Sequence, residues 1–238
     1  MQYPMPTGHL KSIVDMFHNS LWFADSPNMA IGAAVSIVAT LACGKYRYGS
    51  IWPNLSVVIL GSDNSISTSA LKERVSFNVL NRLMIFKHYP KVRLGGDVSI
   101  PTAEDLKIKL LTDEDLAFKL SSIEDVHSPI SIPSALKVET FLSDCLTDLK
   151  NNIDSYPNVK EINKDLYTHM KSHFFKLTLI HSISNGAKEI SIEDVSWAEK
   201  TTYCLMHNVL LSMYGKDQLD SMIEKAKREW QKVPYKRS

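Results

Sequence analysis

The sequence predicts a mainly α-helical protein with one small α/β region. Apolar residues recur at helical spacing over most of the chain, and capping boxes mark several helix starts. Only one run, Leu55–Leu60, is rich in β-branched residues and is followed by a glycine, as expected of a strand. The 9 glycines and 10 prolines among 238 residues argue against a turn-rich β-sandwich.

Two helices are expected before residue 45. Helical spacing of apolar residues indicates the first one: Leu10, Ile13, Val14, Phe17 and Leu21. In the second, Ser26 is the N-cap, Pro27 takes the first helical position and Gly44 is the stop. The segment Pro27–Gly44 is uncharged, but it is shorter than the about 20 residues of a membrane span. We therefore interpret it as a buried core helix rather than a membrane helix.

The chain from Tyr46 to Pro90 is predicted to form a turn, a strand, a loop and a helix. Tyr46–Pro53 is the turn region, and the Leu55–Leu60 strand leads into a polar loop, Ser62–Ser69. The helical pattern that follows closes at Pro90 and contains Leu71, Val75, Val79, Leu83 and Phe86.

The second half is predicted to be helical throughout. Capping boxes begin at Thr102, Thr112 and Ser191. The proline-bearing stretch Val126–Pro133 predicts a boundary between an N-terminal region, residues 1–128, and a helical C-terminal domain, residues 129–238. Helical patterns in that domain cover residues 135–151, 159–184 and 192–214, and a last amphipathic pattern runs from 219 to 230.

Charge is distributed in blocks, although Lys+Arg 27 and Asp+Glu 26 give a net charge of only +1. The segment 71–96 has a net charge of +5, the segment 97–125 of −5, and the segment 216–238 of +3. Such blocks are either solvated helix faces or docking faces. The basic segment predicts candidate nucleic-acid contacts from its cationic side chains: Lys72, Arg74, Arg82, Lys87, Lys91 and Arg93.

The three cysteines, Cys43, Cys145 and Cys204, are odd in number and far apart. This spacing fits neither a disulfide scaffold nor a cysteine zinc site, and it favours a reducing compartment. Because the first ten residues lack a basic region, no secretory signal is predicted and a cytoplasmic location is expected. His169 and His173 stand four apart on a helix, but no third ligand is evident, so no metal site is predicted.

The turn after the strand is similar in position to a phosphate-binding loop, G-x-x-x-x-G-K-[ST], between a strand and a helix. The aligned residues are Gly61, Ser62, Asp63, Asn64, Ser65, Ile66, Ser67 and Thr68. The first glycine and the final threonine are present, but Ile66 replaces the second glycine and Ser67 replaces the lysine. Losing that lysine removes a charge-assisted contact to ATP worth about 1.5–3 kcal/mol. These residues predict a degenerate nucleotide-binding loop.

Several motifs in order along the chain resemble a family of helicase-like P-loop ATPases encoded by phages, prophages and plasmids, often found with a primase domain. They are Pro4–Leu10, the Ala-rich helix 30–41 ending in Cys43-Gly44-Lys45, Asn54–Gly61, Pro101–Leu106, Phe174–Ser184 and Ile190–Tyr203. The resemblance implies a P-loop-like strand–loop–helix flanked by helices and a role in DNA replication. It also implies that Lys176 stands where the family tends to carry a nucleotide-sensing arginine.

The departures from this family are as informative as the match. Family members have a longer centre with an acidic Walker B strand, whereas here the best candidate, Asp113-Glu114, reads better as part of a helix start. ATP and Mg²⁺ are therefore disfavoured, and no cofactor is expected. The interpretation is a non-catalytic pseudo-ATPase that binds DNA in replication. The alternatives are an adaptor or inhibitor that docks on a helicase or other replication protein, a homo-oligomer built from the opposed charge blocks, and an active ATPase with non-standard loop chemistry.

Overall fold

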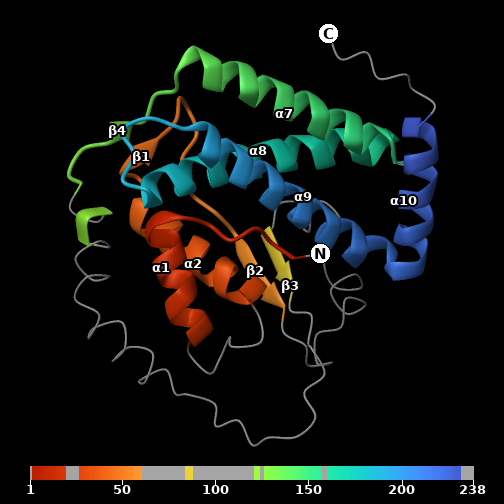
Figure 1. Ribbon diagram of the computed structural model, residues 1–238, viewed down its shortest axis with the longest axis horizontal. Helices are drawn as coiled ribbons and strands as arrows, with labels where there is room; N and C mark the ends of the chain where they lie inside the picture. The colour runs from red at the N-terminus through yellow and green to blue at the C-terminus, as the bar shows by residue number, and fades with distance from the viewer. Residues whose placement is uncertain are drawn as a thin grey trace, which may run out of the picture.

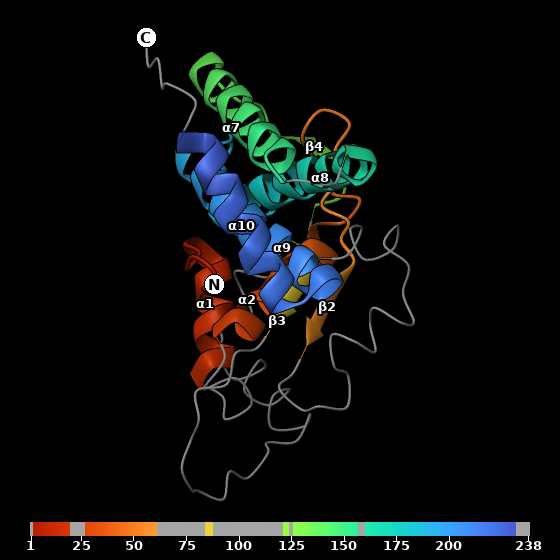
Figure 2. The ribbon, with the colours of Figure 1, turned by 90° about the vertical axis from the view of Figure 1, so that its right-hand side faces the viewer.

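The computed structural model describes residues 2–19, 27–60, 84–87, 121–123, 126–156 and 160–231. Within these ranges the protein is mostly helical, with two small two-stranded parallel sheets. In Figure 1, α7, α8 and α9 form a layer above α1, α2 and the β2–β3 sheet, and α10 lies across one side. Figure 2 shows the same arrangement turned by 90°. The predicted mainly helical fold with a small sheet is therefore confirmed.

The first two helices form where the sequence places them. α1 spans Gly8–Asn19, and the predicted apolar positions that the structure describes are buried: Leu10, Ile13, Val14 and Phe17. α2 spans Pro27–Ala42 and begins at the predicted proline. Gly44 follows α2 with φ of 76°, the left-handed conformation that favours glycine at a helix end. Leu21 and Ser26 lie outside the described residues.

α2 is the buried core helix that its composition predicts. Its side chains at Ala30, Ile31, Ala34, Val35 and Val38 are at most 1% exposed. The small residues let neighbouring elements approach closely, and α2 contacts α1, α8, β2 and β3. A search of the described helices for a stretch long and apolar enough to span a bilayer finds none.

β2 (Val57–Leu60) and β3 (Met84–Lys87) pair in parallel, with Val57 opposite Met84 and Leu60 opposite Lys87. The predicted strand is confirmed with a start two residues later. The predicted helix through Phe86 is wrong at its end, because residues 84–87 are a strand. Met84 and Phe86 are both fully buried. A strand points residues i and i+2 to one face, whereas a helix would turn them about 200° apart, so only a strand buries both against the same layer.

β1 (Tyr46–Arg47) and β4 (Ile130–Ser131) form the second parallel pair. The predicted turn region therefore begins as a strand, and only then turns back through the bridge between Tyr48 and Ile51. Tyr48 and Ile51 exchange two backbone hydrogen bonds of 2.9 Å. β4 lies in the proline-bearing stretch, and its pairing holds that stretch against the chain that leaves α2.

The helices of the second half closely match the predicted ones. α7 spans Leu136–Asp154, α8 Lys160–Ser184, α9 Ile192–Tyr214 and α10 Lys216–Gln231. The capping box at Ser191 starts α9 as predicted, because Ser191 Oγ accepts from Asp194 N and Asp194 bonds back to Ser191 N. The boxes at Thr102 and Thr112 lie outside the described residues.

One hydrophobic core joins the helices to the β2–β3 sheet. α8 packs along α9, α2 packs against α8, and α9 contacts β3. Phe86 enters this core directly over Gly32 of α2: a Cβ atom added to Gly32 would lie 2.7 Å from the Phe86 ring. Gly32 is therefore required for close packing of β3 on α2.

We expect Gly32→Ala to destabilise the protein by about 1–3 kcal/mol, the usual effect of overpacking a core. Alanine has the higher helix propensity by about 1 kcal/mol, so a stabilised variant would show that Phe86 does not contact α2. Urea unfolding of the wild type and of the variant measures the difference. Gly32→Ala/Phe86→Leu, with a narrower side chain over the added methyl group, should recover part of the loss.

Candidate functional site

Most of the predicted site residues lie outside the described part of the chain. This holds for the loop Gly61–Thr68, for Asp113-Glu114, and for the following basic residues: Lys72, Arg74, Arg82, Lys91 and Arg93. Of the six predicted nucleic-acid-binding residues, Lys87 is the one whose backbone the structure describes. It is the last residue of β3 rather than part of a helix. Its register partner is Leu60, the residue before Gly61. The structure thus pairs the backbone of Lys87 with that of Leu60, the last described residue before the predicted loop.

Phe86, the residue of β3 before Lys87, contacts both α2 and the N-terminal segment. It packs on Gly32 of α2. The Tyr3 ring stacks on it, with ring centroids 4.8 Å apart and planes at 30°. Tyr3 itself is 3% exposed. The edge at which the two strands end is therefore anchored to the N-terminal segment of the chain.

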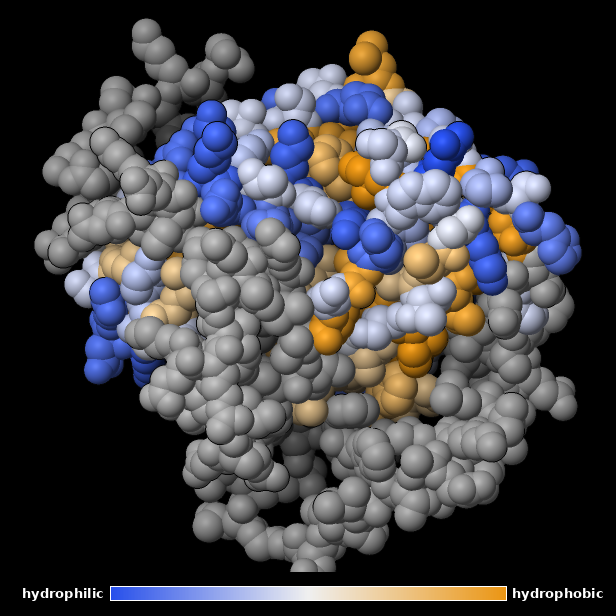
Figure 3. Space-filling view, turned by 180° about the vertical axis from the view of Figure 1, so that it is seen from behind, coloured by the Kyte–Doolittle hydropathy of each residue, from blue (hydrophilic) through white to orange (hydrophobic). Residues whose placement is uncertain are grey.

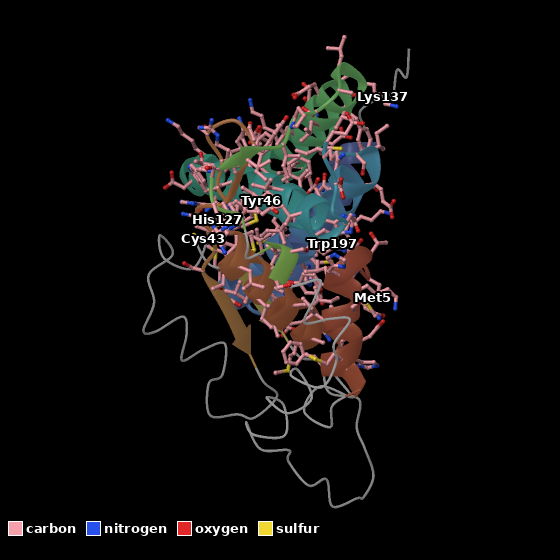
Figure 4. All side chains as sticks on the ribbon, turned by 90° about the vertical axis from the view of Figure 1, so that its left-hand side faces the viewer. Met5, Cys43, Tyr46, His127, Lys137 and Trp197 are labelled. Atoms are coloured by element: carbon pink, nitrogen blue, oxygen red, sulfur yellow. The ribbon has the colours of Figure 1, made fainter. Side chains whose placement is uncertain are left out.

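That segment, residues 2–7, is called here the N-terminal strap. Side chains of α2 and α9 bind it: Asn28 Oδ1 accepts from Tyr3 N (3.1 Å), and Asn208 Nδ2 donates to Tyr3 Oη (2.7 Å). Trp197 Nε1 donates to the carbonyl of Pro4 (3.1 Å), and Figure 4 shows Trp197 and Met5 on the same side of the molecule. The partners on α9 are more than 150 residues away from the strap in sequence. Their hydrogen bonds hold the start of the chain against α9, and Asn28 holds it against α2.

The strap ends at a buried polar cluster, which the sequence did not reveal. His181 of α8 and Asp194 of α9 are 0% and 1% exposed, and His181 Nδ1 lies 2.7 Å from Asp194 Oδ1. Asn185 Nδ2 donates to the same carboxylate oxygen (3.0 Å), and Ser191 N and Oγ donate to the other (2.8 Å each). The Asp194 carboxylate is thus saturated with donors. The His181 ring stacks on Trp197 with centroids 4.7 Å apart.

Hydrogen-bond chemistry assigns the tautomer of His181. Thr7 N–H donates to His181 Nε2 (3.2 Å), so Nε2 carries a lone pair. The ring proton then lies on Nδ1 and is donated to Asp194 Oδ1. Burial alone would raise the pKa of Asp194, but the hydrogen bonds from His181 and Ser191 outweigh it and hold that pKa below its ordinary value.

A threonine hydroxyl, a histidine and an aspartate in line are similar to a hydrolytic triad. Thr7 Oγ1 lies 3.2 Å from His181 Nε2. However, the Nε2 lone pair that would accept the hydroxyl proton already accepts Thr7 N–H, and Thr7 Oγ1 donates its proton to Asn185 Oδ1 (3.1 Å). The histidine is also fully buried. The cluster therefore serves as a structural latch between strap, α8 and α9.

Gly8 completes this latch. Its φ is 63°, and a Cβ atom added there would lie 2.1 Å from Asn185 Oδ1. Only glycine fits both the conformation and the space. The latch thus joins Thr7-Gly8, His181 and the Ser191–Asp194 capping box, so three of the motifs behind the family resemblance meet in space.

The other titratable candidates lack the environment of a reactive group. Burial raises the pKa of the Cys145 thiol to about 12, with a further contribution from Glu199, so this cysteine stays protonated. Lys176 is half-buried, and burial lowers its pKa. His173 is 5% exposed and His169 is half-buried. In the described ranges no three His, Cys, Asp or Glu side chains gather in a way that could hold a metal ion.

Comparisons with protein-family models, with curated proteins and with solved structures found no match to this chain. The resemblance to helicase-like P-loop ATPases therefore rests on the motifs in the sequence alone.

The latch predicts a pH-dependent contribution to stability. Asp194→Asn should lower the free energy of unfolding by about 2–3 kcal/mol at pH 7, because it weakens a buried charged hydrogen-bond network. A carboxyl with a depressed folded pKa contributes its stability above its unfolded pKa of about 3.9 and loses it as pH falls through the folded value. The difference in the free energy of unfolding between the wild type and Asp194→Asn should therefore become smaller below a pH of about 4.

Urea unfolding at several pH values measures this difference in the free energy of unfolding. Glu193→Gln is the matched control, since Glu193 is an exposed carboxylate next to Asp194 on the same helix turn. It should change stability by less than about 1 kcal/mol. Equal effects of the two substitutions at pH 7 would contradict the latch.

Proposed function

We propose that this chain is a non-catalytic nucleic-acid-binding module that acts in the replication of a phage or another mobile element. The observation that carries the proposal is the register of the small sheet, in which Lys87 stands opposite Leu60. Leu60 precedes Gly61, the first residue of the predicted anion-binding loop. The proposal thus places a cation and a loop of backbone N–H groups at one edge.

General features of parallel sheets support this placement. Ligands of open α/β sheets bind outside the carboxyl ends of the strands. Both β2 and β3 end at the edge where Leu60 and Lys87 are paired. The sequence around Lys87 adds Arg82, Lys91 and Arg93, which are suited to phosphate groups because of their charge. A phosphodiester backbone is the ligand that this chemistry favours.

The proposed role is binding without catalysis. The loop lacks the lysine that stabilises the charge developing on transferred phosphate. In the described residues the His181–Asp194 pair is buried, and its hydrogen bonds are used within the latch. The Cys145 thiol is held in its unreactive protonated form. These features favour a pseudo-ATPase over an active enzyme.

A specific observation favours the alternative role as a protein-interaction adaptor. Large apolar side chains are exposed near the start of α7: Ile130 is 45% exposed and Leu136 is 82% exposed. Ile192, also 45% exposed, is close in space because Ser134 bridges to Ile190. Figure 3 shows hydrophobic side chains at the surface on the face seen from behind. Exposed apolar side chains of this kind are suited to contact with a helicase or another replication protein.

We expect salt-sensitive DNA binding that weakens when Arg74, Arg82, Lys87 and Arg93 are replaced by glutamine. Each lost phosphate contact on duplex DNA should reduce the magnitude of the slope of log K against log salt by about 0.9. The quadruple variant should therefore reduce it by up to about 3.6. Fluorescence anisotropy with labelled DNA measures both slopes. In a matched control, glutamine replaces four exposed lysines of the helical half: Lys137, Lys150, Lys164 and Lys188.

Absence of DNA and RNA binding at low salt would refute the nucleic-acid role. Recovery of a replication protein from lysate that resists nuclease treatment would then favour the adaptor role. If the control reduces the slope of log K against log salt by the same amount, binding depends on the net charge of the protein rather than on the cations near the edge of the sheet.

We also expect no Mg²⁺-dependent ATP turnover above a buffer blank, because neither the lysine nor a Walker B acid is found in the sequence. A phosphate-release assay measures the rate for the wild type and for Thr68→Ala. Turnover in the wild type that Thr68→Ala abolishes would overturn the non-catalytic role.

A further inference from the structure

The hairpin that follows α2 alternates cations and aromatic rings, reading Lys45-Tyr-Arg-Tyr-Gly-Ser-Ile-Trp52. Tyr46 and Tyr48, two positions apart, both pack against the core, so Arg47 between them points to the opposite face. Arg47 is exposed. The bridge between Tyr48 and Ile51 sets the two arms of the hairpin side by side.

Arg47 and Trp52 flank this bridge on opposite arms. Residues in opposite positions of a hairpin point to the same face, so the guanidinium and the indole share one side. Trp52 is half-buried, and within the described part of the chain it does not pack against the hydrophobic core. The hairpin therefore combines a cation with an aromatic ring on its outer face.

A second cation, on α8, lies beyond the other face of the hairpin, the face that Tyr48 occupies. The Phe175 ring lies 6.1 Å from the Tyr48 ring, and Lys171 Nζ lies 6.0 Å from the Phe175 centroid. Lys171 is exposed. In the described part of the chain neither Arg47 nor Lys171 forms an ion pair, so both charges can meet an external anion.

The surroundings carry little opposing charge. Residues 43–60 and residues 171–188 contain no aspartate or glutamate. One carboxylate contacts the hairpin: Glu139 accepts from Tyr48 Oη (2.7 Å) and from Ser134 Oγ. Both hydrogen bonds lower the Glu139 pKa, so this carboxylate is ionised and is already bonded to two neutral donors. Figure 4 shows Tyr46, Cys43 and the exposed His127 together on this side of the molecule.

We infer that the Lys45–Trp52 hairpin, with Lys171, is a contact surface for single-stranded nucleic acid. Arg47 and Lys171 bind backbone phosphates, and Trp52 offers a face on which a base stacks. The inference deepens the proposed function and rests on it: the strand that reaches the edge at Leu60 and Lys87 is bound a second time at the hairpin that leads into β2.

The pairing of cations with an aromatic ring selects single strands over duplexes. In a duplex the bases are stacked inside, so only the phosphates reach the protein, whereas the bases of a single strand are free to stack on aromatic side chains. Such surfaces bind without sequence preference, and a single strand of DNA or RNA offers the same chemistry.

The test uses full-length protein and a fluorescein-labelled oligothymidylate of about 20 nucleotides, longer than the about 4–16 nucleotides that one small binding fold covers. Arg47→Gln/Lys171→Gln should lower the slope of log K against log salt by about 1.4, because each phosphate contact on a single strand contributes about 0.7. Trp52→Ala should weaken binding about tenfold with the slope unchanged, and Trp52→Phe should recover most of that loss.

Lys11→Gln/Lys150→Gln is the charge-matched control, since both lysines are exposed and lie on α1 and at the opposite end of α7. Circular dichroism checks that every variant is folded. If the wild type binds neither a single strand nor a duplex even at low salt, both the proposed function and this inference fail, whereas binding to a duplex alone overturns only this inference. If the wild type binds a single strand, but the hairpin variants match the control or a duplex competes equally well, only the hairpin inference is overturned. An oligouridylate arm distinguishes DNA from RNA.

Discussion

The buried carboxylate of Asp194 is the constraint on which the arrangement of the described chain depends. A buried charge without partners would cost several kcal/mol, so it must be met by donors from whatever surrounds it. Here Ser191, Asn185 and His181 supply them. Because His181 then offers its second nitrogen to Thr7, one charge fixes the start of α9, the end of α8 and the end of the N-terminal strap together.

This constraint reaches the small sheet through the strap. Tyr3, held by Asn28 and Asn208, covers Phe86, and Phe86 rests on Gly32. Leu60 and Lys87 are therefore the last residues of two paired strands, and one of these strands packs on both the strap and α2. A rigid edge suits a binding role, since a contact that is already in position loses less conformational entropy when a ligand binds.

The two proposed contact regions flank β2. The hairpin 45–52 precedes this strand, and the predicted loop at Gly61 follows it. A single nucleic-acid strand that touches both would be bound along the length of β2, and two weak sites on one rigid body give avidity without a new contact. The latch explains why His181 and Asp194, which look like catalytic partners, contribute to shape instead of chemistry.

The sequence by itself determined the helices, because spacing, proline starts and capping boxes are local signals. The buried character of α2, the capping box at Ser191 and the approximate extents of α7–α10 were all predictable in this way. Only the tertiary structure decided that Met84–Lys87 is a strand, that the turn region begins as β1, and that Thr7, His181 and Asp194 meet. Strand pairing and a latch across 174 residues depend on partners distant in the chain, and no local periodicity encodes which partners those are.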